Sequence, residues 1–435
     1  MSTDARPTQE RNASLPPTAA GEFDGRRAVT VAVLVAALGY FVDLFDLILF
    51  TVLRRPSFAA LGLDDAQALS WGHLVINWQL TGMLLGGVAW GVLADRRGRI
   101  TVLFGSIIMY SLANLANAFV ADLYTYSALR FIAGFGLAGE LGAGITLVSE
   151  LLPTKLRGIG TTIVATVGLA GAVVAGLVGE LLTTKYPEMG WRAAYAIGGV
   201  LGLMLLALRV GVLESGIFRD AKVTGVARGD IRMLLWPPRR LGRFLGVILV
   251  GMPIWFAGGV LFVFSPEIGK ELGLNPAPTA ANAVIFSYVG VVLGDLASGL
   301  LSQMLRSRKR VIAMFMAAYA VALVLVLTLG GRSLEMYYGL MLLLGATTGF
   351  WVLFVTVASE QFGTNLRATV TTSAPNFVRG AAVPILTVWT LLQERHILAR
   401  IPATYVVGLS CIAIGFAALA FMRESFDLDL DYLEH

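Results

Sequence analysis

The sequence predicts an all-α membrane protein with twelve transmembrane helices in two six-helix pseudo-repeats, and three observations lead to this fold class. Hydrophobic residues make up 57% of the 435 residues and charged residues only 14%, against about 25% charged in soluble domains. Apolar runs of about 20 residues, the length that a helix needs to cross a bilayer, recur along the whole chain. Two loop sequences also recur at a nearly constant offset.

The apolar runs are continuous rather than alternating, so they indicate helices and not the strands of a membrane barrel. A long polar connection over 214–240 separates six runs from six, and we expect it to be a cytoplasmic linker between an N-terminal bundle (28–213) and a C-terminal bundle (241–422). In chain order, the predicted helices cover 28–53, 71–94, 101–120, 124–148, 158–183, 191–213, 241–265, 278–303, 310–330, 336–358, 368–393 and 403–422.

Polar tails flank the two bundles. Residues 1–27 carry mixed charge and three prolines but no apolar core of a signal peptide, so they predict a disordered cytoplasmic tail. Residues 423–435 form a second, short cytoplasmic tail.

The basic residues predict the orientation. With both termini in the cytoplasm, the inner segments carry 22 lysines and arginines and the outer loops carry 8, as the positive-inside rule requires. The net charge of +5 therefore reflects topology and not nucleic-acid binding. Short loops without an extracellular domain favour a bacterial cytoplasmic membrane.

Two repeated loops indicate duplicated halves. The loop 149–157 returns as 359–367 at an offset of 210, and both copies begin Ser-Glu and end Leu-Arg. The basic loop 91–99 returns near 299–310 at an offset of 208. Duplicated six-helix units are typical of transporters, whose site lies between the repeats near the middle of the membrane.

The loop 91–99 reads G-V-L-A-D-R-R-G-R. Its glycines allow a tight turn and close helix approach, and its charged residues can hold neighbouring helix ends. It resembles the loop signature of the major facilitator superfamily, G-x-L-a-D-r-x-G-R, which implies the major facilitator fold and a cytoplasmic lock on the outward-open state. The residues that match the signature are Gly91, Asp95, Arg96, Gly98 and Arg99.

Other segments resemble one branch of that superfamily. The stretch 130–140 reads R-F-I-A-G-F-G-L-A-G-E and is similar to the sugar-porter and metabolite–proton symporter branch. The stretch 213–219 resembles P-E-S-P-R with both prolines replaced, and D-L-F-D at 43–46 stands where the metabolite–proton symporters carry E-W-F-D. We expect charged residues of these inner loops to gate the cytoplasmic side, namely Glu150, Arg157, Glu214, Glu360 and Arg367.

Ionisable residues inside membrane helices are costly and therefore indicate function. Asp46 in the first helix and Arg130 in the fourth come to similar depths at about 1.5 Å per residue, and the resemblance implies such a pair in proton-coupled members. Contact keeps the carboxylate ionised, and separation lets it take a proton; a static ion pair is the alternative. Asp43, one turn before Asp46, is another possible proton carrier. Glu140 either relays a proton inward or packs among glycines and caps nearby backbone.

Arg379 is the main candidate for substrate binding. It lies near the middle of the eleventh helix, three residues after Asn376, and that helix has no carboxylate nearby. A guanidinium group matches a carboxylate with two parallel hydrogen bonds, so we expect an anionic substrate; the alternative is an acidic partner on another helix, such as Asp295. Weaker candidates, of types that often serve only helix packing, are Asn77, Gln79 and Trp255.

Other functional classes lack their sequence signals. There is no P-loop of an ATP motor, and the three histidines are scattered, so we expect neither a cofactor nor a metal. The single Cys411 makes no intrachain disulfide. The fifth helix lacks the proline of the G-P-x-x-G-G pattern of drug–proton antiporters, which disfavours multidrug efflux. No nucleophile–base constellation indicates an enzyme.

The resemblance together with these residues predicts a secondary active transporter that imports a small organic acid with protons by alternating access. The alternative is a carrier of a neutral sugar, polyol or zwitterion, working as a symporter or a uniporter. A non-transporting sensor on the same fold usually has long cytoplasmic extensions, which this chain lacks. The expected partners are the small-molecule substrate, protons and the lipid bilayer, with the protein acting as a monomer.

Overall fold

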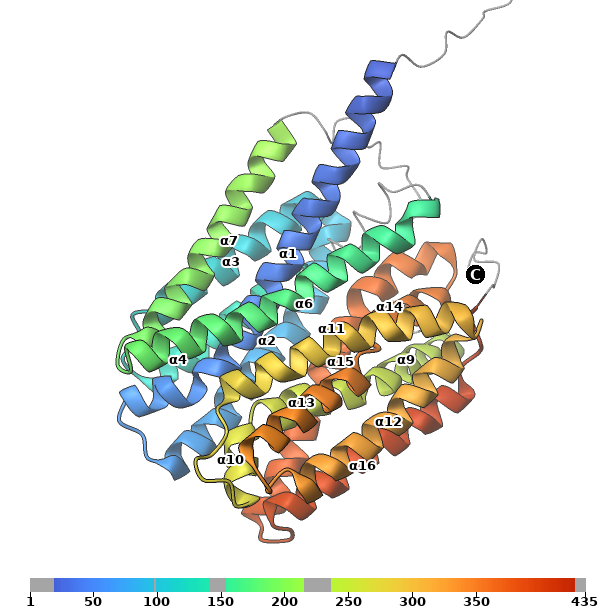
Figure 1. The fold of residues 1–435 in the computed structure, drawn as a ribbon. Helices are drawn as coiled ribbons and strands as arrows, with labels where there is room; N and C mark the ends of the chain where they lie inside the picture. The colour runs from blue at the N-terminus through green and yellow to red at the C-terminus, as the bar shows by residue number, and fades with distance from the viewer. Residues whose placement is uncertain (1–18, 98, 141–153, 215–235, 427–435) are drawn as a thin grey trace, which may run out of the picture.

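The computed structural model describes residues 19–97, 99–140, 154–214 and 236–426, and these residues form a bundle of long helices (Figure 1). Within them, eight helices are long and apolar enough to cross a membrane. The helices of the first half are α1 (Ala19–Ala60), α2 (Asp65–Arg97), α3 (Arg99–Asn117), α4 (Leu123–Leu137), α6 (Thr154–Lys185) and α7 (Gly190–Glu214). Those of the second half are α9 (Pro238–Phe256), η1 (Ala257–Phe262), α10 (Ser265–Glu271), α11 (Ala280–Met304), α12 (Arg308–Leu329), α13 (Leu334–Thr348), α14 (Trp351–Glu360), α15 (Thr364–Glu394) and α16 (Arg400–Phe421).

The order of helices follows the prediction when α9 and η1 count as one spanning segment, with α10 following it, and α13 with α14 count as another. Several helices begin where a side chain accepts a hydrogen bond from the first turn, as helix starts require. The capping residues are Asp122, Thr279, Ser307 and Ser333. The first helix begins at Ala19, nine residues before its predicted start, so it continues the membrane helix into the expected tail.

Three predicted helices are interrupted in the structure. The helix predicted over 124–148 ends at Leu137, where α4 closes in a turn at Ala138 and Gly139. The segment predicted as one helix over 241–265 contains the π-helical turn η1, and the segment over 336–358 breaks between α13 and α14. At the break between α13 and α14, a β-carbon on Gly349 would lie 2.6 Å from the backbone nitrogen of Asp295 on α11. Only glycine fits there, so close packing against α11 sets the position of the break.

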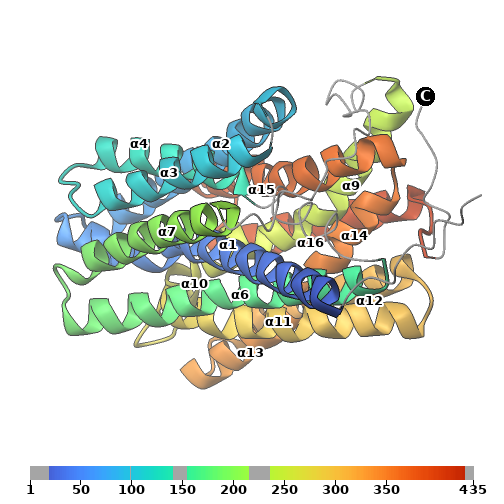
Figure 2. The same cartoon turned by 90° about the horizontal axis from the view of Figure 1, so that it is seen from above.

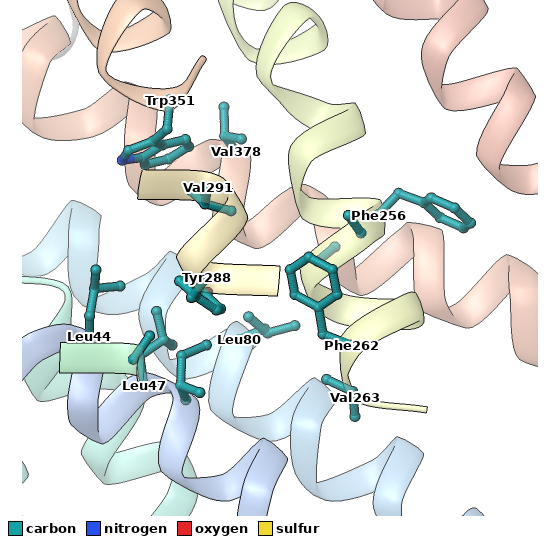
Figure 3. Close-up of a cluster of buried hydrophobic side chains, with 14 of the residues drawn as sticks. Leu44, Leu47, Leu80, Phe256, Phe262, Val263, Tyr288, Val291, Trp351 and Val378 are labelled. Carbon is teal, nitrogen blue, oxygen red and sulfur yellow. The ribbon is translucent and has the colours of Figure 1, made fainter. Parts of the chain in front are cut away.

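The two halves meet along two pairs of neighbouring helices. In both views α6 runs beside α11, and α2 packs against α15 (Figures 1 and 2). The centre of this interface is a buried hydrophobic cluster that draws on α1, α2, η1, α11 and α14 (Figure 3). Its labelled members include Leu44, Leu80, Phe262, Val291 and Trp351. Burial of this surface holds the two bundles together at mid-height.

A buried ion pair joins the halves at the end of the bundle remote from the termini, which we name the far end. Arg54 of α1 is fully buried and donates to both carboxylate oxygens of Glu267 of α10 at 2.7 Å. Its guanidinium group also donates to the carbonyl of Val263 at 3.2 Å and lies 4.7 Å from the ring centroid of Phe264. Arg55 adds a third hydrogen bond to Glu267, at 3.0 Å. The far end is therefore closed in this structure.

Candidate functional site

Arg379 of α15 reaches across the interface to the first half. It is 1% exposed, and its Nη2 lies 3.3 Å from Oδ2 of Asp43, a fully buried residue of α1. The sequence suggested Asp295 as an alternative partner, but the structure gives that position to Asp43. An arginine of one half thus neutralises an aspartate of the other, at a depth where neither charge meets solvent.

Aromatic side chains surround this ion pair. The guanidinium carbon of Arg379 lies 5.8 Å from the ring centroid of Trp255, a candidate from the sequence. The rings of Trp255 and Trp351 are 6.4 Å apart in an edge-on arrangement. Trp351 then donates from Nε1 to the hydroxyl of Tyr40 at 3.2 Å, again between the halves. A cation beside flat apolar surfaces suits a carboxylate attached to a planar group.

Asp46 and Arg130 lie near each other without direct contact. Arg130 donates to Oδ1 of Asn114 and stacks at 4.7 Å on the ring of Tyr195. Asp46 is fully buried next to Asn114 and within electrostatic range of Arg130, yet neither of its carboxylate oxygens makes a well-aligned hydrogen bond. The two predicted partners, Asp46 and Arg130, are therefore close enough to interact electrostatically but do not form an ion pair. Arg130 binds Asn114 instead.

Glu140 makes a buried ion pair. It accepts two hydrogen bonds from Arg209 of α7, one of them at 3.0 Å, and the two residues are only 2% and 7% exposed. A β-carbon at Gly39 would overlap both groups, so that glycine leaves room for the pair. The sequence suggested that Glu140 either relays a proton or packs among glycines and caps backbone. In the structure, it packs against a charged partner on another helix.

Two of the three amide candidates bind backbone groups. Asn376 donates to the carbonyl of Ala138 at the end of α4, a contact of 3.0 Å between the halves. Gln79 donates to the carbonyl of Leu47 at 3.2 Å. Asn77 lines a separate groove of about 450 Å³ between α2 and α15, which does not include Arg379.

The expected gating residues are described only in part. Glu360 accepts from Arg308, at 3.3 Å, and from Ser425, at 2.6 Å, so the second copy of the basic loop does contact a neighbouring helix end. A β-carbon at Gly91 would meet nothing within 4 Å, so no close helix approach depends on that glycine here. Gly98 and Glu150 lie outside the described residues. Only the backbone, which is helical, is described for Asp95, Arg96, Arg99, Arg157, Glu214 and Arg367.

Several residues of the central site were not singled out in the sequence. Arg209 carried a signal, because it is a charge within an apolar run. Tyr40, Asn114 and Trp351 are ordinary residues of membrane helices, and only the packing of helices against one another brings them to the charged groups. In the described part of the chain, no three His, Cys, Asp or Glu side chains come together to hold a metal.

Comparisons with known proteins agree with this architecture. The family model described as Major Facilitator Superfamily matches residues 29–387. The niacin transporter NiaP of Acinetobacter baylyi is 28% identical over 81% of this chain and 85% of its own. The cis,cis-muconate transport protein of the same organism is 26% identical over 92% and 96%. Among solved structures, the proton:xylose symporter XylE superposes with a TM-score of 0.69 at 17% identity, over 93% of this chain and 98% of its own.

Proposed function

The chain belongs to the Major Facilitator Superfamily, a family of integral membrane transporters, and the relatives compared are transporters and not enzymes. From this premise, we propose that it imports a small unsaturated or aromatic carboxylate together with protons. The observation that carries the proposal is the buried ion pair between Arg379 and Asp43, which joins the two halves. We further propose that the protein works as a monomer in a bacterial cytoplasmic membrane, with both termini on the inner side.

Arg379 supplies the binding group for an anion. A buried guanidinium is stable only with a partner, and Asp43 serves as that partner while the site is empty. A substrate carboxylate offers two oxygens to the same group. We therefore expect the substrate to displace Asp43 and to take over the neutralisation of Arg379.

The displaced aspartate provides a link to protons. Once Asp43 loses Arg379, its charge is buried without compensation, which is unfavourable until a proton neutralises it. Asp46 lies one turn further along α1 and already lacks a well-aligned hydrogen bond. Substrate binding and protonation are thus coupled, because each favours the other at the same helix.

The aromatic surroundings support a planar acid. Trp255, Trp351 and Tyr40 lie around Arg379, and flat conjugated rings pack well against such side chains. The names of two relatives, a niacin transporter and a cis,cis-muconate transport protein, refer to molecules of this kind.

Uptake into proteoliposomes tests the proposal. Labelled benzoate, nicotinate, cis,cis-muconate, xylose and betaine are supplied with and without an inward proton gradient. We expect gradient-driven accumulation of an unsaturated carboxylate. Arg379→Gln should weaken its binding by at least about tenfold, the loss of a charged hydrogen-bonded pair. Asp46→Asn should abolish accumulation while leaving substrate exchange intact.

Other outcomes of the same experiment would change the conclusion. Accumulation of xylose or betaine with no response to carboxylates would replace the anion proposal by transport of a neutral or zwitterionic substrate. Unaltered carboxylate affinity in Arg379→Gln would remove Arg379 from the binding site. Uptake that ignores the gradient would identify a uniporter.

A further inference from the structure

Asp295 of α11 is a buried carboxylate that the proposed transport cycle does not use. It is 8% exposed, and its Oδ1 accepts a hydrogen bond from the backbone N–H of Val352 at 3.1 Å. Its Oδ2 is buried and makes no well-aligned hydrogen bond, although the backbone N–H of Trp351 also approaches the carboxylate, and no lysine or arginine pairs with it among the described residues. One oxygen thus caps the start of α14, while the other has no well-aligned donor.

The break between α13 and α14 fixes this carboxylate firmly. Gly349 packs against the backbone of α11 at Asp295, so the first turn of α14 begins directly beside it. The cap therefore holds one carboxylate oxygen in place, and the orientation of the other follows from it. A buried acceptor without a donor costs about 1–3 kcal/mol, which favours any ligand that supplies one.

Asp295 belongs to the same central region as Arg379. Tyr288, Val291 and Asp295 follow one another at spacings of three and four, so they lie on one face of α11. Figure 3 shows Tyr288 and Val291 in the cluster that also contains Trp351. Tyr40 lies within electrostatic range of both Arg379 and Asp295.

A continuous aromatic surface connects the two charged groups. Arg379 lies against Trp255, whose ring contacts the ring of Trp351. Trp351 is the first residue of α14, next to the N–H that Asp295 caps. A planar acid with its carboxylate on Arg379 and its ring along these indoles would direct its other end toward Asp295.

We propose that Asp295 determines substrate specificity by accepting, through Oδ2, a hydrogen bond from a hydroxyl or amino group at the end of the substrate opposite to its carboxylate. The inference rests on the proposed function, because it requires an acid held by Arg379. In this arrangement, Arg379 donates hydrogen bonds at one end of the site and Asp295 accepts them at the other. A second carboxylate at the opposite end of the substrate would present acceptors to an acceptor instead of a donor, and it is rejected.

Binding of a matched set of acids to the detergent-purified protein, measured by calorimetry, tests this role. The ligands are benzoate, the three monohydroxybenzoates and benzene-1,4-dicarboxylate. For the wild type, we expect at least one hydroxybenzoate to bind about tenfold or more tightly than benzoate, since benzoate leaves a buried acceptor without its donor. The dicarboxylate should bind more weakly than benzoate.

Asp295→Asn isolates the second oxygen. Asparagine keeps an oxygen for the N–H of Val352 and replaces Oδ2 by an N–H donor. The hydroxybenzoate should then bind with about the same affinity as benzoate, and the affinity for the dicarboxylate should rise about tenfold. Asp65→Asn, which changes an exposed carboxylate at the start of α2, is the control and should leave all ratios unchanged. If Asp295→Asn does not fold, Asp295→Ser provides an alternative cap without charge.

The outcomes separate the inference from the function on which it rests. Arg379-dependent binding of benzoate with no preference for any hydroxybenzoate in the wild type would overturn the role of Asp295 and leave the proposed function standing. Unchanged ratios in Asp295→Asn would reduce Asp295 to a cap of α14. Failure of every carboxylate to bind would overturn both.

Discussion

At the scale of single residues, the centre of the molecule holds, besides Asp295, three buried carboxylates and three buried arginines. Two pairs are in contact, and in the third, Arg130 is engaged by Asn114 while Asp46 has no well-aligned hydrogen bond. The paired groups are Asp43 with Arg379 and Glu140 with Arg209. Burying charges is costly unless they are paired, so of these three carboxylates Asp46 is the one whose protonation state is easiest to change.

Replacing Asp43 tests whether it competes with the substrate. In Asp43→Asn, Arg379 loses its charged partner, and an anion that restores neutrality should bind at least about tenfold more tightly. Concentrative uptake should be lost, because the displaced group no longer takes a proton. Binding measured by calorimetry, together with gradient-driven uptake, checks both effects. Weaker binding would mean that Asp43 helps to hold the substrate and does not compete with it.

The same residues mark how far sequence reasoning reached into the site. Asp46, Arg130 and Arg379 stood out because each is a charge within an apolar run. Arg54 was assigned to an outer loop because it lies at the end of such a run, although it is fully buried. Its partner on α10 is more than two hundred positions away, and no local pattern indicates a contact of that kind.

At the scale of elements, the helices were predictable and their interruptions were not. Continuous apolar length fixed the spanning segments to within a few residues at most ends. The break after α13 occurs without a proline, while Pro375 and Pro384 lie inside the unbroken α15. The break depends on contact with α11, which is distant in the sequence, so helix propensity alone does not reveal it.

Gly349→Ala tests the origin of that break. The added methyl group would overlap the backbone of α11 at 2.6 Å, and such overpacking costs about 1–3 kcal/mol. We expect a lower melting temperature and reduced uptake. Gly339→Ala on the same spanning segment is the matched control, since its β-carbon meets nothing within 4 Å, and it should be neutral or slightly stabilising. Equal effects of the two substitutions would mean that the contact with α11 does not set the break.

At the scale of the whole molecule, closure of the far end depends on a buried ion pair. Alternating access requires the two halves to separate there, and separation exposes Arg54 and Glu267 to water. Breaking a buried pair by removing one partner costs about 3–5 kcal/mol. The pair therefore favours the closed arrangement that the structure shows, and opening must be driven by interactions gained elsewhere.

Glu267→Gln should shift the protein toward a state open at the far end. Arg54 then lacks a charged partner while closed and regains hydration on opening, so we expect at least about a tenfold change in the equilibrium. Spin labels at Asp64 and Asn275, in a Cys411→Ser background, would report longer distances. Lys270→Met removes only the exposed bond to Asp65 and should have little effect. An unchanged distance distribution in Glu267→Gln would exclude the pair as a closing contact.

The far-end pair should not respond to pH near neutrality. Burial raises the pKa of Glu267, which lies beyond the span ending at Phe262, but Arg54 and Arg55 outweigh burial and hold that pKa at about 2. Because the pKa is lowered on folding, the stabilisation is complete above the ordinary value of 4.5 and is lost as the pH falls toward 2. Between about pH 5 and 8, uptake by Glu267→Gln should therefore follow the same pH profile as the wild type. A shifted profile would contradict this assignment.

The indole pair beside Arg379 gives the protein an optical reporter of its own occupancy. Trp255 and Trp351 are 6.4 Å apart, and the guanidinium group lies 5.8 Å from the first of them. An aromatic guest stacked there would change the environment and the quenching of both rings, and movement of a nearby charge would shift their emission wavelength. Transport intermediates in this chain can thus be followed by stopped-flow fluorescence without any attached dye.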